Sequence, residues 1–371
     1  MDKAFGIVSY PGQRIWVHGM QDHRPIGAFS FLGRYRLIDF PLSNMSNSGI
    51  DNIQVYINRE PRSLVKHLGS GRHYNINSKR GKIDMLFSSK VGVHDLYNTD
   101  IAAFAENLES IESARCPYVV LAPAYMVYAQ NFDTLLEAHI ESGADITLLY
   151  HAVDNAKEAY LSCNTLNLNR QKGVLSIEPN RGNAKNKNIF MDTYIMKKEL
   201  FISLIKKAQK LSSLYTLVDV INTVIDDLDI RGIHHRGYFA AITDFKSYFE
   251  ANLSLIDRKV SSTLFDSEWP IYTRTNDSCP TQYFEHADVK SSVVSNGCVI
   301  EGTVKNCVVG RGAVIKKGAV VENCVILPDV VIGTDVHVEN AVLDRRSKVI
   351  RVKHVSGSAE APAYISRNDV L

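Results

Sequence analysis

The chain has 371 residues, of which 45% are hydrophobic and 22% are charged, as in ordinary globular proteins with room for more than one domain. Its net charge of +2 gives no field suited to nucleic acid or an anionic membrane, and no apolar run reaches the ~20 residues needed to span a bilayer. The first residues show no signal-sequence pattern, and the six cysteines include no C-x-x-C pair. We therefore expect a cytoplasmic protein with reduced thiols, no metal of its own, and no nucleic-acid or membrane partner.

The first part of the chain, residues 1–256, alternates short apolar runs with longer amphipathic ones. Strands are expected at 4–9, 52–57, 118–121, 146–152 and 189–195, and helices at 101–113, 131–142, 198–210 and 217–228. This alternation predicts an α/β, Rossmann-like domain with a mixed, mostly parallel sheet, in which ligands bind beyond the carboxyl ends of the strands. Residues 164–177 alternate around a Gln-Lys-Gly turn and are predicted to form an inserted hairpin.

The rest of the chain has a different pattern. Residues 257–288 contain two X-Pro steps and many polar turn residues, which indicates a linker. In residues 289–371, aliphatic residues recur six apart, at Val308, Val314, Val320, Ile326, Ile332 and Val338. A six-residue period with small residues between turns is typical of a left-handed parallel β-helix of hexapeptide repeats.

One long run carries a family resemblance. Residues 33–44 read GRYRLIDFPLSN and residues 47–50 read NSGI, while residues 248–253 read YFEANL. These segments resemble the nucleotidyltransferase family of ADP-glucose pyrophosphorylase (glucose-1-phosphate adenylyltransferase), and the resemblance extends over essentially the whole chain. The family joins ATP to glucose 1-phosphate, with release of pyrophosphate. The resemblance thus implies a nucleotidyltransferase domain followed by a β-helix.

The glycine-rich phosphate loop of the family, G-G-x-G-T-R-L, is altered here. The matching segment, residues 10–15, reads YPGQRI, so only Gly12 and Arg14 are kept. Backbone N–H groups bind phosphate at close range only where side chains leave room, and proline has no N–H to donate. The family's A-K-P lysine is replaced by Arg24, a planar guanidinium that does not substitute freely for an ammonium. We expect binding of ATP in the family manner to be impaired.

The positions of the family's two metal-binding aspartates are occupied by alanine. The family's L-A-G-D motif reads LAPA at residues 121–124, ending in Ala124, and the D-V-G-T motif begins with Ala241. A hard cation such as Mg²⁺ requires oxygen ligands, which alanine does not offer. Loss of this charge neutralisation costs several kcal/mol of transition-state stabilisation. No catalytic residue and no metal site are therefore assigned to this chain.

The positions of the sugar contacts differ as well. Of the family's W-Y-[RK]-G-T-A loop the chain keeps Tyr97, and of V-E-K-P it keeps Glu178 but not the lysine. In the family's S-M-G strand the glycine is replaced by Asp192, whose charge would repel a phosphate. Together with Gly12, Arg14 and Arg24, these residues are the expected remnant of a degenerate substrate pocket.

The combination of a kept scaffold and an altered pocket resembles the non-catalytic, D-type companion subunit within this family. The resemblance implies a regulatory, catalytically impaired protein in bacterial glycogen biosynthesis. It implies a hetero-oligomer, by family analogy a tetramer, with a catalytic subunit that holds the Mg²⁺. It also implies a sugar-phosphate or nucleotide effector. The basic residues Arg345, Arg346 and Arg351 are the hypothetical effector contacts, against the alternative of a solvated charged face.

Two alternatives remain open on the sequence. The first is an active nucleotidyltransferase with a rebuilt metal site, for which the nearby carboxylates are Asp100, Asp192 and Asp244. The second is a binding module that senses sugar phosphates or nucleotides without a catalytic partner.

Overall fold

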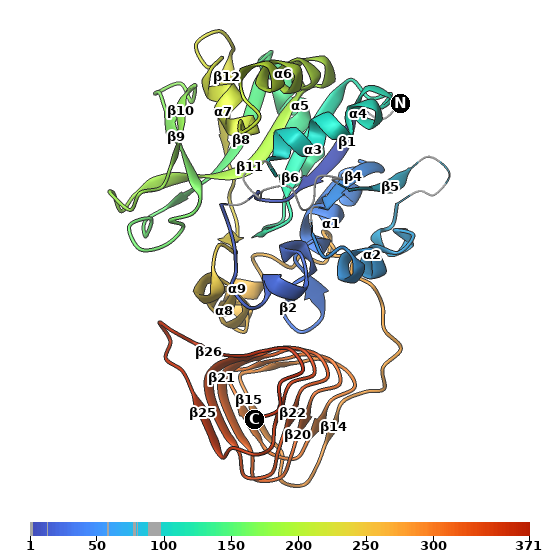
Figure 1. Ribbon diagram of the computed structural model, residues 1–371, viewed down its shortest axis with the longest axis vertical. Helices are drawn as coiled ribbons and strands as arrows, with labels where there is room; N and C mark the ends of the chain where they lie inside the picture. The colour runs from blue at the N-terminus through green and yellow to red at the C-terminus, as the bar shows by residue number, and fades with distance from the viewer. Residues whose placement is uncertain (1–2, 13, 58, 77–78, 80, 88–97) are drawn as a thin grey trace.

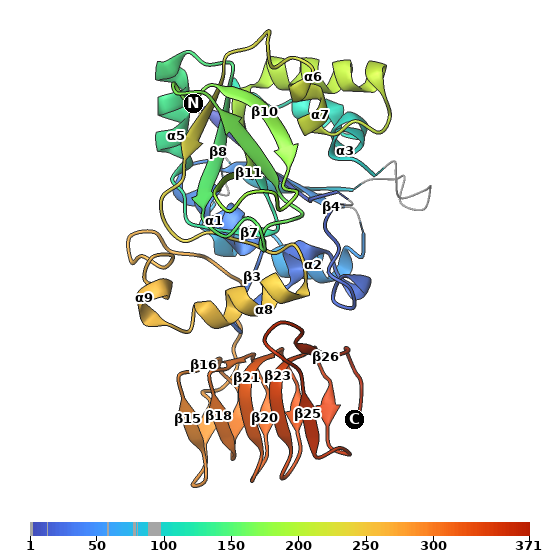
Figure 2. The ribbon, with the colours of Figure 1, turned by 90° about the vertical axis from the view of Figure 1, so that its left-hand side faces the viewer.

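The computed structural model describes residues 3–371 except residues 13, 58, 77–78, 80 and 88–97. An α/β domain lies above a prism of stacked strands, and an irregular segment joins them along one side (Figures 1 and 2). This arrangement confirms the predicted nucleotidyltransferase-like domain followed by a β-helix. No helix in the described part of the chain is long and apolar enough to cross a membrane.

The α/β domain is built on a mixed sheet. Its parallel half has the order β6-β1-β4-β5, formed by β6 (Tyr118–Pro123), β1 (Ala4–Ser9), β4 (Asn52–Ile57) and β5 (Lys82–Phe87). The long strand β11 (Lys187–Lys197) runs antiparallel to β6 and to β8 (Ile146–Val153), and β12 (Ile230–His234) runs parallel to β8. The expected hairpin is present as β9 (Asn164–Leu168) and β10 (Val174–Pro179). A short antiparallel pair, β2 (Ser30–Phe31) and β3 (Tyr35–Arg36), lies outside this sheet.

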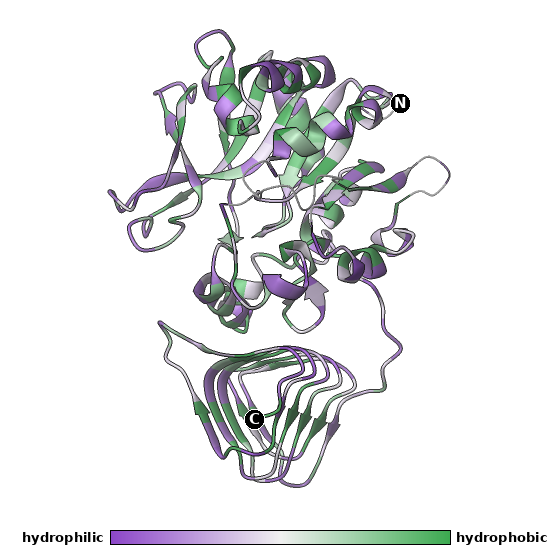
Figure 3. Cartoon of the chain, viewed as in Figure 1, coloured by the Kyte–Doolittle hydropathy of each residue, from purple (hydrophilic) through white to green (hydrophobic). Residues whose placement is uncertain are grey.

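Helices cover the sheet and enclose two apolar clusters. One cluster includes buried residues of α1 (Asp39–Asn47), α5 (Phe132–Ser142) and α8 (Phe245–Ser254), and the other includes those of α3 (Asp100–Glu106), α6 (Lys198–Leu211) and α7 (Leu217–Asn222). The other helices among the described residues are α2 (Arg62–Leu68), α4 (Leu108–Glu112), α9 (Arg258–Ser261) and the short 3-10 turns Gln21–His23, Ile26–Ala28 and Arg72–Tyr74. Figure 3 shows the hydrophobic residues concentrated on the sheet and on the helix faces against it.

Two predicted helices are shorter than expected. The segment 101–113 forms two helices, because Asn107 leaves the helical conformation between α3 and α4. The segment 217–228 is helical only to Asn222, and turns follow. Periodicity marks the buried stripe of such segments, but local backbone bonding decides where the helix ends.

The prism has three walls of parallel strands. The first wall holds β14 (Gln282–Tyr283), β17 (Val299–Ile300), β20 (Val314–Ile315), β22 (Val331–Ile332) and β24 (Lys348–Val349). The other two walls share β21 (Val320–Ile326) and β23 (His337–Leu343) and add β15 (Asp288–Lys290), β18 (Thr303–Lys305), β25 (His354–Ser356), β16 (Val293–Val294), β19 (Val308–Val309) and β26 (Ala363–Ile365). Strand β14 lies inside the segment expected to be a linker.

The coil length differs from the six-residue series in the sequence. Val308 pairs with Val325, and Val309, not Val308, pairs with Ile326. Stacked residues such as Asn306 and Asn323 are 17 apart, so each of these coils is one residue short of three hexapeptides. The series Val308 to Val338 therefore indicates the β-helix correctly but does not form one column of stacked side chains.

The two domains pack closely. Gly33 has a φ of +66°, and a Cβ at this position would lie 2.8 Å from the carbonyl oxygen of Val309 in the β-helix. Gly19 has a φ of +77°, and a Cβ there would lie 2.4 Å from the ring of Tyr364. Only glycine combines this backbone conformation with so close an approach. The two glycines therefore fix the α/β domain against the prism.

Candidate functional site

The loop that replaces the phosphate loop leaves the sheet at its expected position. β1 and β6 run side by side to their carboxyl ends, where Ser9 pairs with Pro123, and the N–H of Ala124 donates to the Ser9 carbonyl over 2.8 Å. Gly12 has a φ of +63°, a conformation that glycine adopts without strain, and a Cβ at this position would meet open space. Tyr10 is half-buried and packs against an apolar cluster, which places bulk at the start of the loop.

The structure brings the two alanine positions together. Ala241 belongs to β13 (Ala240–Ala241), which pairs antiparallel with β7 (Met126–Val127), two residues beyond Ala124. Ala124 is 7% exposed and Ala241 is 3% exposed, and both belong to the same apolar cluster. These residues do not fit Mg²⁺, because they present methyl groups where the cation needs oxygen. Among the described residues, no three His, Cys, Asp or Glu side chains are grouped so as to hold a metal ion.

The three carboxylates named for a rebuilt metal site already accept bonds from the protein. Asp244 caps α8 and accepts from the N–H of Ser247 over 2.7 Å. Asp100 accepts from the N–H groups of Ile101 and Leu217 over 2.8 and 3.1 Å, and burial raises the pKa of its carboxyl to about 6. Asp192 belongs to a separate cluster with Arg14.

Arg14, Asp192 and Tyr125 form a compact polar cluster at the loop. One oxygen of Asp192, Oδ2, accepts from Arg14 Nη2 over 2.5 Å and from the Tyr125 hydroxyl over 2.6 Å. The Asp192 side chain is 11% exposed, while that of Arg14 is 34% exposed. Burial and the adjacent carboxylate raise the pKa of Tyr125 well above its ordinary value, so the phenol keeps the proton it donates. The cluster connects the loop after β1 to the middle of β11.

The other expected pocket residues lie apart from this cluster. Arg24 is 8% exposed and forms an ion pair with Asp344 of the β-helix, so it joins the two domains. Glu178 is exposed on β10 and accepts from the hydroxyl of Ser176 over 2.8 Å. Tyr97 lies outside the described residues. The structure therefore unites Gly12, Arg14 and Asp192 but not Arg24 or Glu178.

A basic cavity of about 500 Å³ lies between the α/β domain, the segment after α9, and the β-helix. Its cationic lining consists of Arg24, Arg34, Arg36, Lys66, Arg274, Arg311, Arg345 and Arg367, with His23 and His67, against the acidic residues Asp277 and Asp329. Of the three arginines predicted as effector contacts, Arg345 lines this cavity. Arg346 and Arg351 are not among the lining residues, and Arg346 instead lies 3.7 Å from a carboxylate oxygen of Asp329.

Several donors in this cavity are buried without a protein partner. Nε of Arg311, Nε of Arg367 and the hydroxyl of Ser63 have no hydrogen-bond partner among the described residues. Burial lowers the pKa of Arg36 to about 10, and repulsion from Arg24 and Arg345 contributes. Crowded cations with unused donors are the chemistry of an anion site, and arginine suits phosphate in particular because of its fork of N–H groups.

Most of this cavity is not predicted by the sequence. Arg34 and Arg36 stand inside the family-like run, and Arg311 stands in a Gly-Arg-Gly turn of the β-helix. Arg274 and Arg367 come from segments without regular periodicity. The available signal was the alternation of arginines around Tyr35, but the lining residues come from segments far apart in the chain and meet only through the packing of the two domains.

Comparison with known proteins agrees with this architecture. The nucleotidyl transferase family matches residues 12–258, and the GlmU-like, C-terminal hexapeptide family matches residues 280–362. The glycogen biosynthesis protein GlgD of Geobacillus stearothermophilus is 34% identical over 327 residues, covering 86% of this chain and 83% of its own. The GlgD protein of Bacillus subtilis is 29% identical over 371 residues, covering 99% and 96%.

A glucose-1-phosphate adenylyltransferase of Clostridium perfringens is 30% identical over 299 residues, covering 79% of this chain and 75% of its own. The matches therefore extend over both domains and most of each relative. The chain belongs to the nucleotidyl transferase family, in the group of the GlgD glycogen biosynthesis proteins and the glucose-1-phosphate adenylyltransferases.

Proposed function

We propose that this chain is a regulatory, catalytically impaired subunit of a glucose-1-phosphate adenylyltransferase complex in bacterial glycogen biosynthesis. The observation that carries the proposal is that Ala124 and Ala241, at the positions where family catalysis needs carboxylates, are both buried in one apolar cluster, with Ala241 paired to Met126 two residues after Ala124. In this proposal the Mg²⁺ and the chemistry belong to a catalytic paralogue, with which the chain forms a cytoplasmic hetero-tetramer. The intact scaffold is then kept because the complex requires it.

We further propose that the basic cavity binds a phosphorylated effector. The Nε donors of Arg311 and Arg367 there have no hydrogen-bond partner in the described part of the chain, and the cavity is lined by both domains and the segment between them. An anion that bridges these elements would offset the repulsion between their guanidinium groups and hold the domains in one arrangement. Differential binding to such an arrangement is the way in which a ligand shifts an equilibrium between two states.

The first experiment measures ADP-glucose formation from ATP and glucose 1-phosphate with Mg²⁺. The chain alone, the catalytic paralogue alone and the co-purified pair are compared. We expect the chain alone to be inactive, and the pair to differ from the paralogue in rate or in effector response. Turnover by the chain alone at ~1–10³ per second would overturn the proposal and support an active enzyme with another metal site. Effector binding without association with the paralogue would support the sensing module instead.

The second experiment tests the cavity on the same pair. Glucose 6-phosphate, AMP and inorganic phosphate serve as probes, with binding followed by calorimetry and response followed by the rate of the complex. Arg311→Ala together with Arg367→Ala is expected to weaken binding of the responsive probe at least tenfold. Arg170→Ala, in the exposed turn between β9 and β10, is the control and should leave binding unchanged. Equal binding by both variants would remove the cavity as the effector site.

A further inference from the structure

Asp192 adopts a backbone conformation that its side chain does not favour. Its φ is +44°, in the left-handed region that residues with a Cβ rarely adopt, and it lies where the pairing of β11 with β8 shifts register between Phe190 and Tyr194. The family pattern has glycine at this position, which adopts such a conformation at no steric cost. The fold thus keeps a glycine conformation here while the sequence supplies a carboxylate.

The strained position aims this carboxylate at Arg14. Oδ2 of Asp192 lies 2.5 Å from Arg14 Nη2 and 2.6 Å from the Tyr125 hydroxyl. The other oxygen, Oδ1, is buried and has no partner among the described residues. The residue as a whole is 8% exposed, whereas about a third of the Arg14 side chain remains open to solvent. The carboxylate is therefore an inner counter-ion to an arginine whose outer side is accessible.

We propose that Asp192 is a built-in anion that occupies Arg14 in place of a ligand phosphate and so closes the loop after β1 to phosphorylated ligands. A guanidinium binds carboxylate and phosphate through the same N–H geometry, so one anion excludes the other. The internal carboxylate is always present at high effective concentration, and a ligand must displace it and also approach its charge. Asp100 is a second carboxylate close enough to Arg14 for the two charges to interact.

The Arg14–Asp192 pair lies apart from the basic cavity, and its proposed role needs no catalytic partner. The cavity lies between the domains and is lined by Arg34, Arg311 and other residues, but not by Arg14 or Asp192. The proposed role of Asp192 is limited to phosphate binding by the loop after β1. The cavity and a loop freed from Asp192 would bind the same class of ligand, so the experiment separates the two sites.

The test uses the full chain carrying Arg311→Ala and Arg367→Ala, so that binding in the cavity is suppressed. Inorganic pyrophosphate is titrated by calorimetry in phosphate-free buffer with EDTA. Adding Asp192→Gly is expected to tighten pyrophosphate binding at least tenfold, with an affinity that falls as salt rises. Asp192→Asn should give a smaller gain, because it removes the charge and keeps the side chain. Adding Arg14→Ala to Asp192→Gly should abolish the gain.

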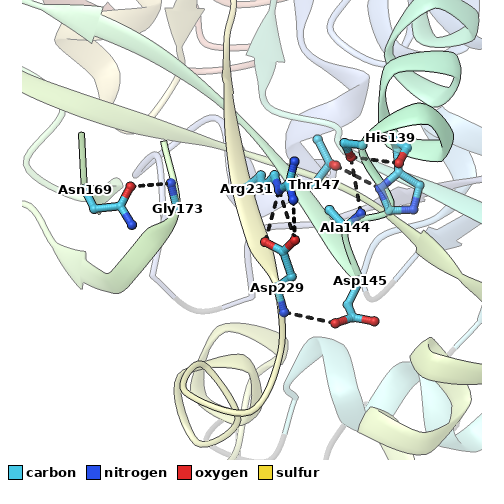
Figure 4. A network of polar contacts seen from close by, with 9 residues as sticks. His139, Ala144, Asp145, Thr147, Asn169, Gly173, Asp229 and Arg231 are labelled. Carbon is cyan, nitrogen blue, oxygen red and sulfur yellow. Dashed lines mark hydrogen bonds and ion pairs between the residues drawn. The ribbon is translucent and has the colours of Figure 1, made fainter. Parts of the chain in front are cut away.

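The matched control is Asp229→Asn, which breaks the exposed Arg231–Asp229 ion pair far from the loop (Figure 4) and should give no gain. Folding of each variant is checked by its thermal transition. A folded Asp192→Gly variant with unchanged affinity would overturn the proposal, as would a gain that persists after Arg14→Ala. Loss of folding in both Asp192→Gly and Asp192→Asn would also overturn it, because the pair would then be purely structural.

Discussion

At the scale of single residues, the chain uses its charges to hold parts of the molecule together. Arg24 illustrates this, because the sequence places it with the substrate contacts and the structure places it against Asp344. Asp344 is fully buried and accepts from Arg24, from the Tyr364 hydroxyl over 2.7 Å and from the N–H of Arg345 over 2.5 Å. A carboxylate in such a place is tolerated only while it is paired and hydrogen-bonded.

The Arg24–Asp344 pair leads to a prediction about stability. Arg24→Ala leaves the Asp344 carboxylate buried without its cation, and we expect the free energy of unfolding to fall by about 3–5 kcal/mol. Urea denaturation followed by circular dichroism measures this. Arg231→Ala, which breaks the exposed pair with Asp229 shown in Figure 4, is the control and should change stability little. Equal effects of the two substitutions would mean that the buried pair does not hold the domains.

At the scale of elements, one corner of the β-helix is turned by a column of asparagines. Asn306, Asn323 and Asn340 have φ values of +50°, +50° and +47° and lie one coil apart. Nδ2 of Asn306 donates to Oδ1 of Asn323 over 2.7 Å. Asparagine is suited to this corner because it tolerates the left-handed conformation and its amide bonds to the next coil.

Two substitutions of Asn323 separate the contribution of the left-handed backbone conformation from that of the amide hydrogen bond. Asn323→Gly keeps the backbone conformation and loses the amide bond, so we expect a loss of about 1 kcal/mol in the free energy of unfolding. Asn323→Ala also places a Cβ without compensating bonds in the left-handed region, and should cost about 1–3 kcal/mol more. Thermal melts of the full chain give the comparison. If alanine were no worse than glycine, backbone conformation would not be what selects asparagine here.

At the scale of the whole molecule, the α/β domain holds several buried or half-buried histidines and favours their neutral form. Burial lowers the pKa of His73, His139, His151, His234 and His235. His235 is 2% exposed, and burial lowers the pKa of its imidazole to about 4. Asp100 acts in the opposite direction, because its raised pKa lets the folded chain bind a proton below about pH 6.

The lowered pKa values of the histidines predict that acid destabilises the folded chain. Between about pH 6.5 and pH 4 the unfolded state protonates His235 and the folded state does not, so stability falls as pH falls through this window. The slope from one such group is at most about 1.4 kcal/mol per pH unit. His235→Gln should flatten the pH dependence of the urea midpoint, whereas His286→Gln, at an exposed position, should leave it unchanged. An equal slope in both variants would show that His235 does not titrate in this way.

The two domain types, most of the buried strands and the family can be predicted from the amino-acid sequence. Strands such as β1 and β4 match their predicted bounds because continuous apolar runs identify a buried strand without reference to its neighbours. That residues 124 and 241 are alanines is also read from the sequence alone, and an alanine side chain offers no ligand atom in any fold. Helix ends and the 17-residue coil were missed, because they depend on local bonding at residues such as Asn107 and Asn323.

Which charged residues meet depends on the packing of the whole chain and cannot be predicted from the sequence. Arg14 and Asp192 are 178 positions apart and Arg24 and Asp344 are 320 apart, so no local pattern connects them. The basic cavity likewise combines residues of α2, the segment after α9 and the corners of the β-helix. The physical reason is that periodicity reports the environment of each segment, whereas charge pairing depends on distances that are set when the two domains pack.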